Sequence, residues 1–253
     1  MSHKVCIDIG HGSNTYPPSK GIGDFAEWLF NNAVGRMAKE LAEVNGFTVY
    51  LSQPLNAEEV DLHKRISNIN KTTCEIGFSI HANASINNTV TGHEFWYWHT
   101  NQIGKKLASI AEANAIALLP NKRRGIKASS TKPNENFGIL RATKMPFVLG
   151  EFGFFTNPEE QNLLKSEKFQ MLCAKVVVKT MCDYFGQEFR TLPDSKVVPP
   201  TKIPQWKATP LQNLVKEGLV NDFENWLLKL DEPAPNWLVF TLIDRLNQEF
   251  KKK

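Results

Sequence analysis

The chain has 253 residues, a hydrophobic fraction of 42% and a formal net charge of +4. This length is enough for one domain with a full-sized hydrophobic core and a smaller additional segment. No apolar run approaches the roughly 20 residues of a membrane span. A mild charge without a basic helix or a stacking motif argues against a nucleic-acid partner.

Four cysteines occur without a CxxC pair, at positions 6, 74, 173 and 182. Their scatter favours buried free thiols over disulfides, so we expect synthesis in a reducing compartment. Residues 1–4 lead directly into an apolar strand, and we therefore also expect no signal peptide.

The first 190 residues alternate between short apolar runs and longer segments with helical spacing. Strands are predicted at residues 5–9, 47–51, 76–81, 92–98 and 148–155. Helices are predicted at residues 25–45, 58–71, 102–119 and 158–186. This alternation predicts an α/β fold, with a mostly parallel or mixed twisted sheet covered by helices on both faces.

Two connecting segments of this domain are predicted to be irregular. Residues 11–24 form a long loop rich in turn formers, and Asp24 is expected to cap the next helix, which places Glu27 in its first turn. Residues 120–144 are basic, with a short strand predicted at 138–140. This basic segment is interpreted either as a solvated loop or as a substrate contact.

The last 60 residues differ in composition from the main domain, which we place at residues 1–190. Residues 191–204 contain four prolines among Lys, Ser and Thr and predict a semi-rigid linker. Residues 205–253 carry two helical patterns. So small a helical module rarely buries enough surface to be very stable alone, so we expect it to self-associate or bind a partner.

Three predicted strands end in a single polar residue, and these residues are His11, His81 and Glu151. Sites in α/β sheets gather at the carboxyl ends of strands, so we expect the three side chains to meet there with Glu27. Catalytic zinc takes three protein ligands from His and Asp/Glu and leaves one position for water.

We therefore assign His11, Glu27 and His81 as ligands of one zinc ion and Glu151 as the general acid and base. The phenylalanines beside Glu151 are expected to raise its pKa. The glycines on either side of His11 are expected to let the backbone turn tightly around it.

Each assignment has a structural alternative. A histidine at a strand end is more often a surface or hydrogen-bonded residue, and the helix dipole alone favours Glu27 in a first turn. Glu151 is harder to explain structurally, because an unpaired carboxylate among apolar residues is costly. Asp24 is the alternative ligand to Glu27.

These residues carry a resemblance to a known family. The motifs are Asp-Ile-Gly-His11-Gly, Glu27 opening a helix, Ser-Ile-His81-Ala-Asn83 and Leu-Gly-Glu151-Phe-Gly-Phe-Phe-Thr-Asn. Over residues 4–186 the chain resembles the zinc-dependent N-acetylmuramoyl-L-alanine amidases of the amidase-3 class, found in bacterial cell-wall hydrolases and phage endolysins. Ile9 stands where proline is usual, and no ligand position is lost.

The resemblance implies hydrolysis of the amide bond between N-acetylmuramic acid and L-alanine in bacterial peptidoglycan. It implies zinc on the three ligands named above and catalysis by Glu151, and we expect substrate contacts from Asn83 and Arg141.

The expected setting is that of a phage endolysin. It would be made in the bacterial cytoplasm and reach the wall through a holin or by lysis, and residues 205–253 would bind wall polymer or self-associate. The alternatives are a zinc peptidase that cuts within the stem peptide and a non-catalytic wall-binding protein.

Overall fold

The computed structural model describes residues 2–16 and 20–191. The chain divides into two units, Met1–Thr191 and Leu192–Lys253. The predicted linker after Thr191 and the predicted helical module lie outside the described residues, so the domain assignment stays a prediction.

A six-stranded sheet forms the centre of the first unit, in the order β4-β1-β5-β8-β6-β7. Its strands are β1 (Lys4–Ile9), β4 (Thr48–Leu51), β5 (Ile76–Asn83), β6 (His93–Trp98), β7 (Arg123–Ser129) and β8 (Phe147–Phe154). β4, β1, β5 and β8 run parallel, whereas β6 is antiparallel to β8 and parallel to β7. The predicted mixed, mostly parallel sheet is confirmed.

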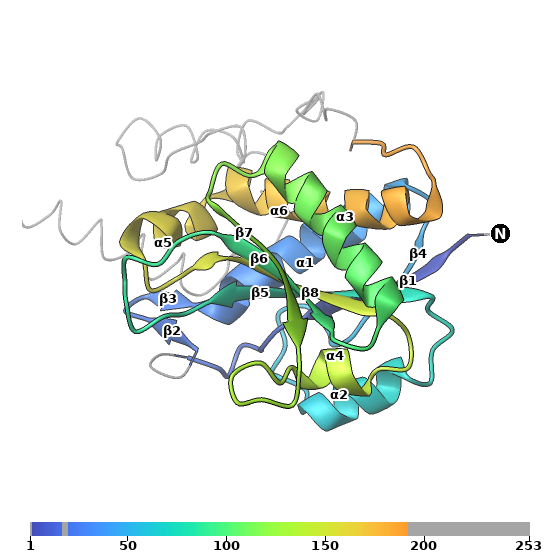
Figure 1. Ribbon diagram of the computed structural model, residues 1–253, viewed down its shortest axis with the longest axis horizontal. Coiled ribbons are helices and arrows are strands. Elements are labelled where there is room, and N and C mark those ends of the chain that lie inside the picture. The colour runs from blue at the N-terminus through green and yellow to red at the C-terminus, as the bar shows by residue number, and fades with distance from the viewer. Residues whose placement is uncertain (1, 17–19, 192–253) are drawn as a thin grey trace, which may run out of the picture. The chain divides into compact units, whose positions relative to one another are not determined.

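Helices cover both faces of this sheet (Figure 1). One face carries α1 (Glu27–Val44), α3 (Gln102–Leu118) and α6 (Glu167–Phe185), and the other carries α2 (Leu62–Ile69) and α4 (Gly138–Ala142). The α/β fold class predicted from the sequence is therefore confirmed.

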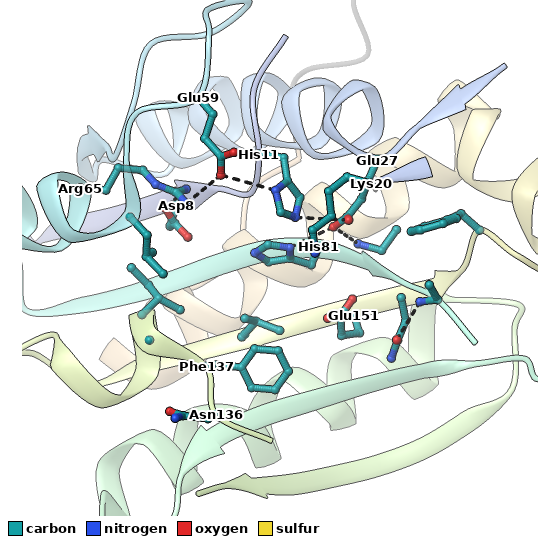
Figure 2. A pocket seen from close by; sticks show the side chains of 18 residues that line it. Asp8, His11, Lys20, Glu27, Glu59, Arg65, His81, Asn136, Phe137 and Glu151 are labelled. Atoms are coloured by element: carbon teal, nitrogen blue, oxygen red, sulfur yellow. Dashed lines mark hydrogen bonds and ion pairs between the residues drawn. The ribbon is translucent and has the colours of Figure 1, made fainter. Parts of the chain in front are cut away.

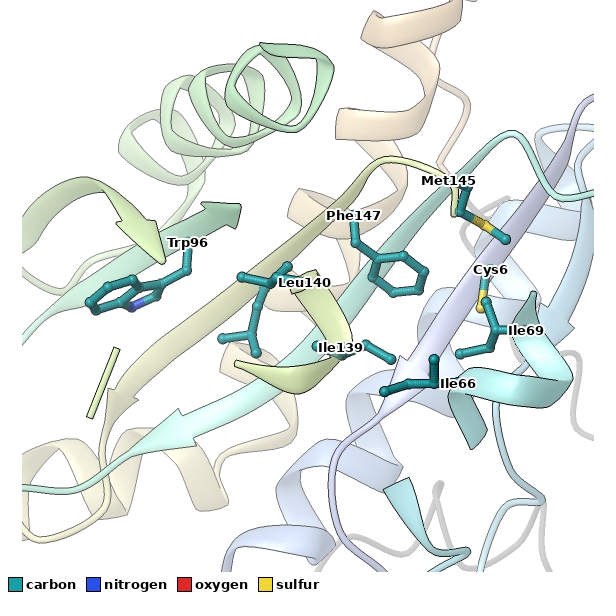
Figure 3. Packing of buried hydrophobic residues seen from close by; sticks show 9 residues of the cluster. Cys6, Ile66, Ile69, Trp96, Ile139, Leu140, Met145 and Phe147 are labelled. Atoms are coloured by element: carbon teal, nitrogen blue, oxygen red, sulfur yellow. The ribbon is translucent and has the colours of Figure 1, made fainter. Parts of the chain in front are cut away.

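Each face of the sheet has its own apolar layer. Beneath α1, the rings of Phe30, Phe78 and Phe152 are fully buried, and the Phe152 centroid lies 6.1 Å from that of Phe30 and 6.2 Å from that of Phe78. Beneath α2 and α4, a second cluster includes Ile66 and Phe147 (Figure 3). Burying a large apolar side chain stabilises the fold by about 1.5–3 kcal/mol, so these layers fix the sheet on which the polar residues stand.

Polar side chains set where several helices begin. Asp61 accepts a hydrogen bond from the backbone N–H of Lys64 at the start of α2, and Asn101 does the same for Gly104 at the start of α3. Asn157 caps α5 (Pro158–Lys165). These side chains satisfy N–H groups that have no partner within the helix.

The end of the predicted 11–24 loop contains a small hairpin, and this corrects the predicted start of α1. β2 (Gly21–Ile22) pairs with β3 (Phe25–Ala26), and Gly23 supplies the positive φ of 59° that the two-residue turn needs. α1 therefore begins at Glu27, with Ala26 as its N-cap and no side-chain cap. The expectation that Asp24 caps this helix is wrong.

The basic segment at 120–144 is more regular than predicted. It contains the edge strand β7, whose charged residues obscured the alternation, and the predicted strand at 138–140 is instead the short helix α4. A run of two or three apolar residues suits either element, and packing of α4 against α2 decided it. The last predicted helix is two helices, α5 and α6, separated at Ser166.

The four cysteines are free thiols, buried at three positions and half-buried at Cys74. Among the described residues, no helix has both the length and the apolar character required to cross a membrane.

Candidate active site

The sheet register brings the predicted strand-end residues together. His81 on β5 lies directly beside Glu151 on β8, and Ile9 at the end of β1 lies beside Ile80. His11 follows two residues after β1, so its ring reaches the same end of the sheet. The hairpin of β2 and β3 delivers Glu27 to this point, since the Glu27 N–H bonds to the Lys20 carbonyl at 3.0 Å.

Glu27 stands between the two histidines. Its Oε1 lies 2.9 Å from His81 Nδ1, and its Oε2 lies 3.3 Å from His11 Nε2. One donor atom from each of the three side chains can be chosen so that all lie within 4.8 Å of one another. The structure thus groups the three predicted ligands in one cluster with the donor types that zinc takes.

The histidines also determine the charge of Glu27, which is 3% exposed. Burial alone would raise the pKa of the Glu27 carboxyl, but hydrogen bonds with His11 and His81 lower that pKa far below its ordinary value. Glu27 is therefore a buried carboxylate. The alternative ligand Asp24 lies elsewhere, fully exposed, with its carboxylate 2.8 Å from Lys165 Nζ.

The glycines beside His11 are needed for space. A Cβ on Gly10 would lie 2.2 Å from the His81 ring, and a Cβ on Gly12 would lie 2.1 Å from the backbone nitrogen of Glu59. The left-handed conformation belongs instead to His11, whose φ is 62°. The expectation that the glycines provide the turn is therefore corrected: they let neighbouring groups approach closely.

Glu151 is 7% exposed, and its Oε2 is buried without a hydrogen-bond partner among the described residues. Burial raises the pKa of Glu151 well above its ordinary value, and the charges of Glu27 and Glu94 raise it further. The direction agrees with the prediction, but the cause differs, because Phe152 packs on the opposite sheet face with Phe30.

These groups line a cleft of about 390 Å³. Figure 2 shows the histidines and Glu27 along one wall, with Glu151 next to His81 and Phe137 opposite. The remaining wall is largely apolar and includes Leu62. A site with polar groups along one wall and an apolar wall facing them can orient a substrate and exclude part of its water.

The two predicted substrate contacts have different positions. Asn83 lines the cleft, where its Nδ2 donates to Glu94 Oε1 at 3.1 Å. Arg141 is exposed on α4, donates to Asn136, and is not among the lining residues. The structure therefore brings Asn83 to the site and leaves Arg141 outside it.

Sequence reasoning assigned no role to Glu94, the cross-strand neighbour of Glu151. Glu94 is 2% exposed and accepts hydrogen bonds from Arg124 Nε at 2.7 Å and Lys127 Nζ at 2.6 Å. Burial alone would raise the pKa of Glu94, but these two cations lower it below its ordinary value. The signal was a single carboxylate in an aromatic strand, the same signal that identified Glu151.

A second missed group lies at the other end of the cleft. Asp8 is buried, accepts from Ser79 Oγ at 2.6 Å and pairs with Arg65 Nη1 at 3.0 Å. Glu59 lies beside Arg65 and His11. No short-range pattern indicated this group, because Asp8 precedes Arg65 by 57 residues and Ser79 by 71.

Comparison with known proteins places this geometry in context. The Amidase_3 family, N-acetylmuramoyl-L-alanine amidase, matches residues 5–183. The chain is 27% identical over 188 residues to the N-acetylmuramoyl-L-alanine amidase LytC of Bacillus subtilis, covering 73% of this chain and 36% of LytC. The chain thus spans about a third of that relative's length.

Solved structures match over the same region. The catalytic domain of CwlV, an N-acetylmuramoyl-L-alanine amidase from Bacillus (Paenibacillus) polymyxa, superposes with a TM-score of 0.66 at 26% identity, covering 74% of this chain and 99% of that catalytic domain. An N-acetylmuramoyl-L-alanine amidase from Clostridium difficile 630 superposes with a TM-score of 0.65 at 29% identity, covering 74% and 98%.

Proposed function

The chain belongs to the Amidase_3 family of N-acetylmuramoyl-L-alanine amidases, and on this premise we propose that it is a zinc-dependent hydrolase of bacterial peptidoglycan. The bond cleaved is the amide between the lactyl group of N-acetylmuramic acid and L-alanine. The observation that carries the proposal is the convergence of His11, Glu27 and His81 with Glu151 in one cleft.

The donor set supports zinc at this cluster. Two imidazoles and one carboxylate are a common ligand set of catalytic zinc, and the carboxylate of Glu27 is already ionised between its two histidines. Burial and the charge of Glu27 raise the pKa of the nearby Glu151 carboxyl, and a bound dication would relieve the repulsion between these two groups. When bound, zinc would act as a Lewis acid and make hydroxide available near neutral pH.

Glu151 is proposed as the group that moves the proton. Its carboxylate takes a proton from the attacking water and passes that proton to the amide nitrogen as the C–N bond breaks. The products are the lactyl carboxylate and the free amine of L-alanine. A carboxyl with a raised pKa suits both steps, because it holds the proton between them.

The substrate contacts follow from the cleft. Asn83 lines the cleft, and its hydrogen bond to Glu94 fixes its side chain there. We therefore propose that the Asn83 amide orients a polar group of the substrate. Arg141 lies outside the cleft, so it would contact only a part of the substrate that extends beyond α4.

Digestion of purified peptidoglycan with and without a chelator tests the reaction, with the released ends identified by mass spectrometry. We expect free lactyl groups and new N-terminal L-alanine, lost on chelation and restored by zinc. Cuts within the stem peptide would favour a zinc peptidase. Binding without cleavage would favour a wall-binding protein and contradict the proposal.

Zinc content tests the ligand set separately. Exchange of His81 for alanine is expected to reduce bound zinc from one per chain to nearly none, because two protein ligands would remain. The matched control is His63→Ala, since His63 is exposed on α2. Equal zinc content in the two variants would remove His81 from the ligand set.

The biological setting is proposed as host lysis by a phage endolysin, with residues 205–253 binding wall polymer or another copy of the chain. Expression in bacteria with and without a holin tests it. Lysis only with the holin is expected, whereas lysis without it, or none with it, would contradict this setting.

A further inference from the structure

Both ring nitrogens of His11 face a carboxylate. Nε2 lies 3.3 Å from Glu27 Oε2 inside the candidate zinc cluster, and Nδ1 lies 3.4 Å from Glu59 Oε1 on the other side. The ring is only 13% exposed. Figure 2 shows Glu59 on the far side of His11 from Glu27. A carboxylate at this second nitrogen is placed to determine which nitrogen carries the proton.

Glu59 is held in this place by neighbouring groups. Its backbone N–H donates to Asn14 Oδ1 at 2.9 Å, and its backbone packs against Gly12 so closely that a Cβ there would collide with it. Its Oε1 lies 3.5 Å from Arg65 Nη2. The Glu59 carboxylate therefore faces His11 from a defined position.

Arg65 connects Glu59 to the buried end of β1. Its Nη1 pairs with Asp8 Oδ1 at 3.0 Å and donates to the Ile9 carbonyl at 2.8 Å, while the arginine side chain is 4% exposed. One guanidinium thus faces two carboxylates, Asp8 and Glu59. Because Arg65 is anchored to the strand that precedes His11, the position of Glu59 is tied to the same strand.

The backbone of His11 is fixed separately. Its carbonyl accepts a hydrogen bond from Gln53, whose Oε1 accepts from the Val60 N–H at 2.9 Å. These bonds hold the left-handed backbone of His11 and keep residues 59 and 60 beside it. They do not determine the proton position on the ring. Nδ1 is buried without a hydrogen-bond partner among the described residues, and Glu59, with Oε1 at 3.4 Å, is the carboxylate that faces it.

We propose that Glu59 is a positioning residue that accepts the Nδ1–H of His11 and so directs the lone pair of Nε2 toward the metal cluster. This inference rests on the proposed zinc function. Partners of this kind on the second nitrogen of a ligating histidine fix its orientation and tautomer, and their loss weakens metal binding by about 10- to 100-fold.

The test compares zinc dissociation constants of the full chain, measured by competition with a chromophoric chelator. Glu59→Ala is expected to weaken zinc binding by about 10- to 100-fold relative to the wild type. Glu59→Gln is expected to weaken it less, since the amide oxygen still accepts from Nδ1–H but carries no charge. The matched control is Glu58→Ala, because Glu58 is the exposed neighbour.

The outcomes separate the two proposals. Wild-type protein that binds no zinc would contradict the proposed function itself. Wild-type protein that binds zinc, together with a Glu59→Ala constant within twofold of the Glu58→Ala constant, would overturn the role of Glu59 alone. If Glu59→Ala does not fold, Glu59→Gln is compared with the control instead. Equal zinc affinities of Glu59→Gln and Glu58→Ala would then overturn the proposed role of Glu59.

Nuclear magnetic resonance of the zinc-loaded protein gives a readout that general destabilisation would not produce. The His11 Nδ1–H proton is expected to be visible and slow to exchange in the wild type and in Glu58→Ala, and to exchange rapidly in Glu59→Ala. An unprotected Nδ1 proton in the wild type, or an unchanged one in Glu59→Ala, would contradict the proposal.

Discussion

Two buried carboxylates on the same face of the sheet have opposite environments. Asp8 on β1 is 1% exposed and is matched by the Arg65 guanidinium and the Ser79 hydroxyl. Glu151 on β8 is 7% exposed and keeps one oxygen without a partner among the described residues. Burial costs both groups solvation, but only at Asp8 do neighbouring groups compensate that cost.

The difference is visible in the directions of the two pKa values. Burial by itself would raise the pKa of Asp8, but Arg65 and the hydroxyls of Ser52 and Ser79 lower it. At Glu151 burial raises the pKa and nearby carboxylates add to the effect. We therefore interpret Asp8 as a carboxylate that supports the fold, and the uncompensated Glu151 as the candidate for the proposed proton transfer. Four predictions test this comparison.

The largest expected effect is on activity. Glu151→Gln is expected to lower the rate of peptidoglycan hydrolysis by roughly 10²- to 10⁴-fold, because the amide cannot carry the proton. Zinc content should be unchanged, since Glu151 is not a proposed ligand. The rate of L-alanine amine release measures this, with the exposed Glu40→Gln as control. A rate near that of the control would remove Glu151 from catalysis.

The next effect is on stability at the other carboxylate. Arg65→Met leaves Asp8 buried without its cation, so the free energy of unfolding should fall by about 3–5 kcal/mol. The folded-state pKa of Asp8 is lowered, so its stabilisation is present above the unfolded pKa of about 3.9 and is lost as the pH falls. Urea unfolding at pH 7 measures the change. An Arg65→Met variant as stable as the wild type would show that Arg65 does not compensate the burial of Asp8.

A smaller loss is expected when only one donor to Asp8 is removed. Ser79→Ala deletes the hydroxyl that donates to Asp8 Oδ2 at 2.6 Å. A hydrogen bond to a charged group contributes about 1.5–3 kcal/mol, and the Arg65 pair remains. Urea unfolding at pH 7 measures this change as well. A decrease in the free energy of unfolding as large as that of Arg65→Met would mean that the cation is not the main compensating group.

The smallest effect has the opposite sign. Because the folded-state pKa of Glu151 is raised, its ionisation destabilises the fold as the pH rises above the unfolded pKa of about 4.3. Glu151→Gln should therefore stabilise the metal-free protein by about 1–3 kcal/mol at pH 7 and by almost nothing at pH 4. Equal or lower stability of the variant at pH 7 would show that Glu151 is compensated in the folded state.

The local pattern of the sequence determined the α/β fold and the main candidates for the site. Apolar runs that end in one polar residue specify both a buried strand and its carboxyl end, and strands of this kind meet at one edge of a sheet. His81 and Glu151 could be placed together for this reason. For Glu27 the local pattern predicted a position in the first turn of a helix, not at the end of a strand.

Only the tertiary structure decided features that depend on pairing between distant segments. The charged strand β7 exists because it pairs with β6, and the run at 138–140 is helical because α4 packs on α2. The compensation of Asp8 by Arg65, 57 residues away, and the contact of Glu59 with His11 likewise have no local signal. Burial and charge pairing are properties of the assembled fold, so whether a carboxylate is structural or reactive is decided there.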